Sequence, residues 1–151
     1  MDWNVQWDTE AAEVVAAAAT GLTLASLPAT LKAHLRAAHL ARLRASGPLG
    51  ALLARQSEAH ARDHGIVDLA RTHSGLPDDL LNFHYDPVAC AVAVGWPGGV
   101  VGELPLAYAR DGDVFRWYAD ENGRRTRVLV DLDAESFDET WLTAVEAAQR
   151  T

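Results

Sequence analysis

Residues 80–96, with the sequence LLNFHYDPVACAVAVGW, join a cluster of polar and aromatic side chains to the most apolar run of the chain. Pro87 has a fixed φ and no N–H, which suits the first turn of a helix, so the pattern predicts Asp86 as the N-cap of a helix over residues 88–94. Because this helix offers no polar side, we expect it to be covered on all faces and to end at Gly95. The stretch therefore predicts either a carboxylate aimed at a ligand or ion from a rigid helix, or an ordinary helix cap.

The composition is that of one globular domain. The chain has 151 residues, of which 49% are hydrophobic and 23% are charged, and this suffices for a core within a single domain spanning residues 1–151. The formal net charge of −8 argues against nucleic acid and anionic membranes as partners, because affinity for both comes from Lys and Arg. Small neutral ligands, metal ions and protein partners remain.

Cysteine usage and hydropathy bear on location. Cys90 is the single cysteine, so no disulfide can form within the chain, and a reducing, cytoplasmic location is expected. The alanine-rich run at residues 11–19 contains Glu13 and is too short to span a bilayer. We therefore expect neither a signal peptide nor a membrane segment.

The first part of the chain alternates helix and strand. Asp8 precedes a helix predicted over residues 9–19, whose acidic first turn matches the helix macrodipole. Residues 22–27 have the apolar and β-branched character of a buried strand, which Pro28 ends. This helix-then-strand unit indicates an α/β fold.

Amphipathic helical patterns follow. Residues 31–44 carry leucines at helical spacing and predict one helix, or two short helices with a bend. Residues 49–64 predict a further helix, capped by Gly65. The periodicity is lost over residues 66–79, which predict a loop leading into residues 80–96.

The last third favours a β-meander and a closing helix. Residues 100–108, 114–118 and 126–132 are strand-like, and the turns between them contain Asp-Gly and Asn-Gly pairs. A helix that begins at Asp133 or Ser136 closes the chain. Together these patterns predict an α/β fold with an open, mostly parallel sheet flanked by helices, to which the β-meander and the closing helix are added.

Two polar clusters stand at the ends of apolar elements. They consist of Asp2, Asn4 and Gln6, and of Asn82, His84, Tyr85 and Asp86. Because ligands of open α/β sheets bind at the carboxyl ends of strands, these side chains are candidate ligand contacts, and an acid, an amide and a phenol together suit the hydroxyl groups of a sugar. Trp7, beside the first cluster, is a further candidate for substrate binding, with core packing as the alternative.

Four short motifs stand in order along the chain. They are NVQWDTEAA at residues 4–12, LPAT at residues 27–30, LARLRASG at residues 40–47 and YDPVA at residues 85–89. Their order and spacing resemble the C-terminal half of the inosine/uridine-preferring nucleoside hydrolases across nearly the whole chain. The resemblance implies the C-terminal part of a nucleoside hydrolase-like sheet. It also implies cleavage of the N-glycosidic bond of purine or pyrimidine ribonucleosides.

The resemblance further implies roles for individual residues. Asn4 and Asp2 fall on positions that contact the ribose in that family, and Asp86 falls on a ligand of the ribose-binding calcium ion. Tyr85 stands where the family often has the histidine that protonates a leaving purine. The neighbouring His84 is the alternative proton donor.

Three departures from the family pattern shape the expected activity. The family's calcium loop, DxDxGxDD, is absent from the 151 residues, so Asp86 alone should bind Ca²⁺ weakly, since the ion takes about six to eight oxygen ligands. Asp2 is one methylene shorter than the family's glutamate. Tyr85 has an unperturbed pKa of about 10 and is a poor acid near neutrality, although it can donate a hydrogen bond or stack on a base.

Two functions follow as hypotheses. The first is a ribonucleoside hydrolase that is inactive or incomplete until an N-terminal half completes its site. The second is a non-catalytic α/β domain derived from that family, serving in assembly or ligand binding. The first predicts a ribonucleoside ligand. Both predict a homo-oligomer or association with an N-terminal half, because a half-domain would expose a sheet edge and apolar surface.

A histidine pair on the second predicted helix allows another interpretation. His60 and His64 are four residues apart, a spacing that can chelate zinc. The sequence offers no third ligand nearby, so a solvated helix face is the favoured interpretation.

Overall fold

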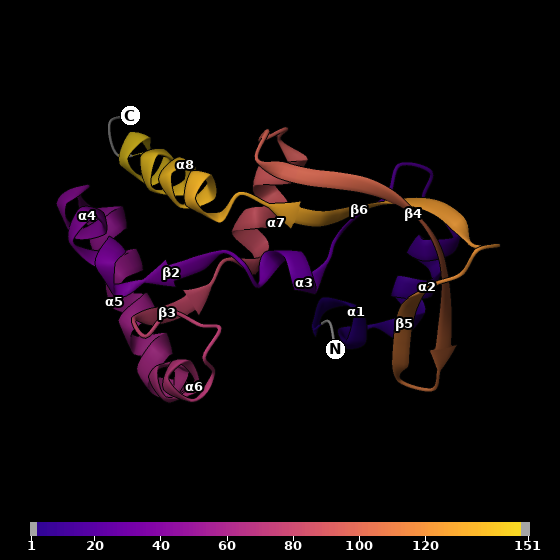
Figure 1. Ribbon diagram of the computed structural model, residues 1–151, viewed down its shortest axis with the longest axis horizontal. Helices are drawn as coiled ribbons and strands as arrows, with labels where there is room; N and C mark the ends of the chain where they lie inside the picture. Colours follow the sequence, from indigo (N-terminus) through magenta and orange to yellow (C-terminus); the bar gives the residue numbers. More distant parts are fainter. Residues whose placement is uncertain (1–2, 149–151) are drawn as a thin grey trace.

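The structure is a computed structural model that describes residues 3–148. In chain order its elements are α1 (Trp3–Trp7), α2 (Thr9–Ala18), β1 (Thr23–Ala25), α3 (Leu27–Thr30), β2 (His34–Arg36), the 3₁₀ helix η1 (Ala37–His39), α4 (Leu40–Ala45), α5 (Pro48–Asp63), α6 (Ile66–Thr72), β3 (Leu80–Phe83), α7 (Tyr85–Ala93), β4 (Gly99–Asp111), β5 (Val114–Ala119), β6 (Arg124–Leu132) and α8 (Ala134–Ala147). Figure 1 shows an elongated molecule with α4, α5 and α6 at one end, α2 and the β4–β5 hairpin at the other, and α3 and α7 between them.

The strands form two sheets. The larger sheet has the order β1-β6-β4-β5, and the smaller one pairs β2 with β3 in antiparallel fashion. The predicted α/β class is confirmed, but the prediction of a mostly parallel sheet is wrong. The predicted β-meander is wrong as well, because β6 pairs with β4 and not with β5, its neighbour in the chain. A tight turn joins β4 to β5 in an antiparallel hairpin, and β6 returns to the other side of β4, also in antiparallel fashion. Among the described strands only β1, three residues long, pairs in parallel, with β6.

Elements with strong local signals are confirmed. The Asp8 side chain accepts a hydrogen bond of 2.9 Å from the Ala11 N–H at the start of α2. The Asp133 side chain accepts one of 3.0 Å from the Ser136 N–H at the start of α8. The predicted helix at residues 49–64 corresponds to α5, and the three predicted strands correspond to β4, β5 and β6. Capping and periodicity are local properties, so sequence alone suffices for these elements.

Two predictions between these elements are wrong. Residues 34–36 form β2 instead of helix, because Leu35 is buried and pairs with Asn82 of β3, so that tertiary pairing overrides the leucine spacing. The predicted loop over residues 66–79 contains α6, which is anchored by the buried Ile66 and Ala70 one turn apart.

The apolar helix α7 also differs from its prediction. It begins at Tyr85, with His84 as the N-cap residue, so Asp86 lies within the first turn and is not the N-cap. Val88 is fully buried, whereas Val94, just after the helix, is 86% exposed. The expectation that all faces are covered is therefore wrong for the described chain.

The core consists of two clusters that share one aromatic residue. One cluster lies among α4, α5, β3 and α8 and contains Leu43 and Leu80. The other lies among α3, α7, β6 and α8 and contains Val88 and Phe137. Trp141 packs against both clusters and so joins the end that contains α4 and α5 to the middle of the molecule. Within residues 3–148, none of the helices has the length and apolar character needed to cross a lipid bilayer.

Candidate functional site

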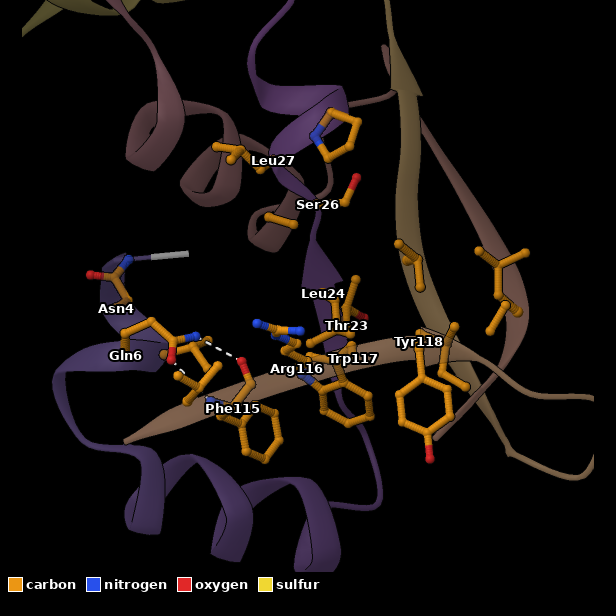
Figure 2. Close-up of a pocket in the computed structure, with 18 residues that line it drawn as sticks. Asn4, Gln6, Thr23, Leu24, Ser26, Leu27, Phe115, Arg116, Trp117 and Tyr118 are labelled. Atoms are coloured by element: carbon orange, nitrogen blue, oxygen red, sulfur yellow. Dashed lines mark hydrogen bonds between the residues drawn. The ribbon is translucent and has the colours of Figure 1, made fainter. Parts of the chain in front are cut away.

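A hollow of about 790 Å³ lies on one face of the four-stranded sheet, where α1, β1, α3 and the strands β4 to β6 contribute its walls (Figure 2). Leu24, Leu106 and Trp117 belong to its largely apolar wall. Arg116 is the single charged side chain among the described residues that line it. We refer to this recess as the hollow. Its size and apolar lining are those of a small-molecule site.

One side of the hollow is held in place by the side chain of Gln6. Its Nε2 donates a hydrogen bond of 2.7 Å to the Phe115 carbonyl oxygen, and its Oε1 accepts one of 2.9 Å from the Phe115 N–H. The Gln6 amide thus occupies the outer edge of β5 as a neighbouring strand would, which positions α1. Gln6 therefore has a structural role, because its side chain attaches α1 to β5. It does not act as one unit with Asn4, the other described member of the first predicted polar cluster.

The carboxyl end of β1 forms another part of the wall. Ser26 Oγ donates a hydrogen bond of 2.7 Å to the Leu129 carbonyl oxygen, and Leu27 and Pro28 then begin α3. Asn4 lines the hollow from α1, and Figure 2 shows its amide at the margin away from Trp117. Asn4 and the carboxyl end of β1, where α/β proteins bind ligands, therefore line the same hollow from different sides.

The second predicted cluster surrounds the start of α7. The His84 ring is 4% exposed and lies 4.5 Å from the Trp141 ring and 5.5 Å from the Phe137 ring, measured between centroids. Burial, aided by two neighbouring histidines, lowers the pKa of His84 to about 4, so the ring is neutral at pH 7. Tyr85 is exposed and stacks on Phe83, and partial burial raises the pKa of its phenol.

The hollow brings together only some of the predicted site residues. Asn4 lines it, whereas Tyr85 lines a different recess beside Phe83, and the exposed Asp86 is not among the described residues of either lining. α3 contacts α7 and also lines the hollow, so it connects the two places. Trp7 is largely exposed and is not among the described residues that line the hollow. Asp2 lies outside the described residues.

The residues present do not form a calcium site by themselves. Between residues 3 and 148, no group of three or more His, Cys, Asp or Glu side chains is placed to hold a metal ion. Asp86 therefore offers one carboxylate, which falls short of the about six to eight oxygen ligands that Ca²⁺ takes. His60 and His64 stack with ring centroids 4.2 Å apart, and His64 Nδ1 lies 3.1 Å from the His60 carbonyl oxygen.

A further polar cluster was missed in the sequence. His34, His39 and Asp138 line a recess of about 800 Å³, and His39 Nε2 lies 3.7 Å from Asp138 Oδ2. Burial raises the pKa of Asp138 to about 6 and lowers the pKa of His34. His34 Nε2, His84 Nε2 and Asp138 Oδ1 are buried without a hydrogen-bond partner among the described residues. No sequence signal links these positions, which the pairing of β2 with β3 and the packing of α8 bring together.

Comparison with known proteins adds no assignment. No protein-family profile matches the chain, and no curated protein matches it.

Proposed function

We propose that this chain supplies one part of a ribonucleoside site of the nucleoside hydrolase kind, in which Asn4 contacts the ribose and Tyr85 and Asp86 stand at the start of α7. The observation that carries the proposal is the position of the Asn4 amide at the margin of an apolar hollow that the carboxyl end of β1 also lines. The four sequence motifs quoted above support ribonucleosides as the ligand class.

Each group has a role that its chemistry allows. The Asn4 amide both donates and accepts hydrogen bonds, which matches the adjacent hydroxyls of a ribose. Trp117 offers a ring face on which a base can stack. Because burial raises the pKa of Tyr85, its phenol stays protonated near neutral pH and is a hydrogen-bond donor in the recess beside Phe83, separate from the hollow.

Turnover requires groups that residues 3–148 do not bring together. Cleavage of an N-glycosidic bond passes through an oxocarbenium-like ribose and needs an activated water. In the resembled family calcium supplies this activation, but the described residues offer it one carboxylate, and we assign no step to the ion. The isolated chain should therefore bind a ribonucleoside without cleaving it.

Binding is tested by NMR titration of the ¹⁵N-labelled chain with uridine and with inosine. We expect saturable shifts of the Asn4 side-chain amide and the Trp117 indole N–H. Asn4→Ala should weaken binding by about 1 kcal/mol, or roughly fivefold, which corresponds to one lost hydrogen bond. Asn122→Ala, in the exposed turn between β5 and β6, is the matched control and should leave affinity unchanged. The absence of saturable shifts with both nucleosides would refute the proposal.

Turnover is tested with a chromogenic riboside and calcium. The chain alone should show none, and adding the separately produced N-terminal half of a nucleoside hydrolase should restore it. Binding without turnover in the mixture would favour the second function, a non-catalytic domain for assembly or ligand binding. The apolar surface that β4 and β6 expose is the observation that favours this second function.

A further inference from the structure

The chain exposes more surface than its mass predicts. Its accessible surface is 9341 Å², whereas a compact monomer of 16.3 kDa is expected to expose about 7,500 Å². The excess, on the order of 1,000 to 2,000 Å², is comparable to the area that one partner contributes to an obligate interface. The elongated arrangement in Figure 1 is consistent with this excess.

Part of the exposed surface is an apolar strip on β4 and β6. It consists of Val100, Leu104 and Val130, whose exposed fractions are 54%, 39% and 40%. The three side chains share one face of the sheet. Val100 and Leu104 are four residues apart on β4, and a Cβ built on Gly102 between them would lie 3.7 Å from both methyl groups of Val130. Single exposed apolar residues are ordinary, but neighbours on one face indicate an interaction surface.

The apolar strip continues directly into the hollow. Leu104 belongs to both, and Val128, which pairs with Gly102, lines the hollow two residues before Val130. A projecting strip and a recess therefore lie side by side on one face. A two-fold axis between them places the strip of each copy against the hollow of the other, which is the arrangement of an isologous dimer.

We propose that the apolar strip and the hollow together form the interface between two copies of this chain. A second copy covers both features, whereas a small apolar ligand would fill the hollow and leave the strip in water. No Asp or Glu is found among the described residues that line the hollow, so that part of the interface brings no carboxylates together. Beside the strip, Asp131 pairs with Val100 across the strands, and its carboxylate is held in an ion pair with Lys32.

The two copies associate through sheet faces. The edge of β5 is already occupied at Phe115 by the Gln6 amide, which prevents a second strand from pairing there. Face-to-face packing needs no free edge and buries apolar side chains between layers about 10 Å apart. The dimer inference does not rest on ribonucleoside binding, but Asn4 and Trp117 both line the hollow, so a second copy and a ribonucleoside would compete for it.

Sedimentation equilibrium of the full chain tests the proposal. At about 100 µM the wild-type chain should have twice the mass of 16.3 kDa. Val130→Arg and, separately, Leu104→Asp should weaken association at least about tenfold, because each buries an unpaired charge at the interface. Leu52→Asp is the matched control, since Leu52 on α5 is 42% exposed and lies at the other end of the molecule.

Two further readouts keep the test decisive. Circular dichroism shows whether each variant is folded. In the wild-type chain, hydrogen exchange at residues 100–104 and 128–131 should slow as protein concentration rises, which needs no variant. A monomeric wild-type chain would overturn the proposal, and so would a dimer that survives both strip variants or dissociates equally with Leu52→Asp. Ribonucleoside titration of Val130→Arg, whose site is not among the described residues that line the hollow, separates failure of this proposal from failure of the proposed function.

Discussion

Replacing Asp138 by Asn should stabilise the protein at neutral pH, and the stabilisation should disappear in acid. The Asp138 side chain is 21% exposed and lies near His39 in the recess between β2 and α8. Its Oδ1 is buried without a hydrogen-bond partner among the described residues. A carboxylate there loses hydration that the nearby Arg36 only partly offsets, so burial raises its pKa to about 6 from its ordinary value of 3.8.

The sign and size of the effect follow from linkage. Because the pKa of Asp138 is raised on folding, its contribution to stability is fully present below the unfolded pKa and is lost as pH rises through about 6. The difference between the two pKa values, at about 1.4 kcal/mol per pH unit, amounts to about 3 kcal/mol. Asn is neutral at every pH and avoids this loss, so Asp138→Asn should gain up to about 3 kcal/mol at pH 7 and almost nothing at pH 4.

The assay is urea unfolding followed by tryptophan fluorescence between pH 4 and pH 7.5. The quantity measured is the difference in unfolding free energy between Asp138→Asn and the wild-type chain at each pH. Glu121→Gln, in the exposed turn after β5, is the matched control and should give a difference that does not vary with pH. The reasoning fails if Asp138→Asn is neutral or destabilising at pH 7, or if its effect is the same at pH 4.

Further predictions concern other contacts of the fold. Folding lowers the pKa of His84 to about 4, mainly by burial, so the stability that this residue contributes is present above pH 6.5 and is lost as the pH falls toward 4. His84→Leu should therefore flatten the dependence of the unfolding free energy on pH in this range. Gln6→Ala leaves the Phe115 backbone groups unpaired and should cost about 1–3 kcal/mol, with faster hydrogen exchange of the Phe115 amide. Asp133→Ala removes the N-cap of α8 and should cost about 1 kcal/mol in urea unfolding. Because both copies carry a net charge of −8, added salt should tighten the dimer, as measured by sedimentation.

Local signals explain what the sequence predicted well. Some signals act between residues only a few positions apart, so the sequence alone contains them in full. They are the N-caps Asp8 and Asp133, the helical spacing of apolar residues along α5, and the turn residues between the last three strands. β2 is different, since its three residues form a strand only because β3, more than forty positions later, pairs with them. The strand order of the large sheet was mispredicted for the same reason, because β6 passes its chain neighbour β5 and pairs with β4 in antiparallel fashion.

The candidate site was predictable only residue by residue. The polar character of Asn4 and its place near the end of an apolar strand were visible in the sequence. The hollow was not, because its lining comes from six elements that the fold assembles. The recess around Asp138 was invisible as well, since that residue reads as an ordinary member of an amphipathic helix. Burial, which shifts its pKa, is a property of the packed structure.

The wrong prediction for α7 and the apolar strip both concern apolar side chains that the chain leaves exposed. The helix was expected to be covered on all faces because apolar side chains in water forgo a stabilisation of about 25 cal/mol per Å². The described chain covers Val88 and leaves Val94 exposed. One exposed valine is ordinary on a folded protein, whereas Val100, Leu104 and Val130 lie side by side on one face of the sheet, and the free energy of covering them is what a second copy would gain.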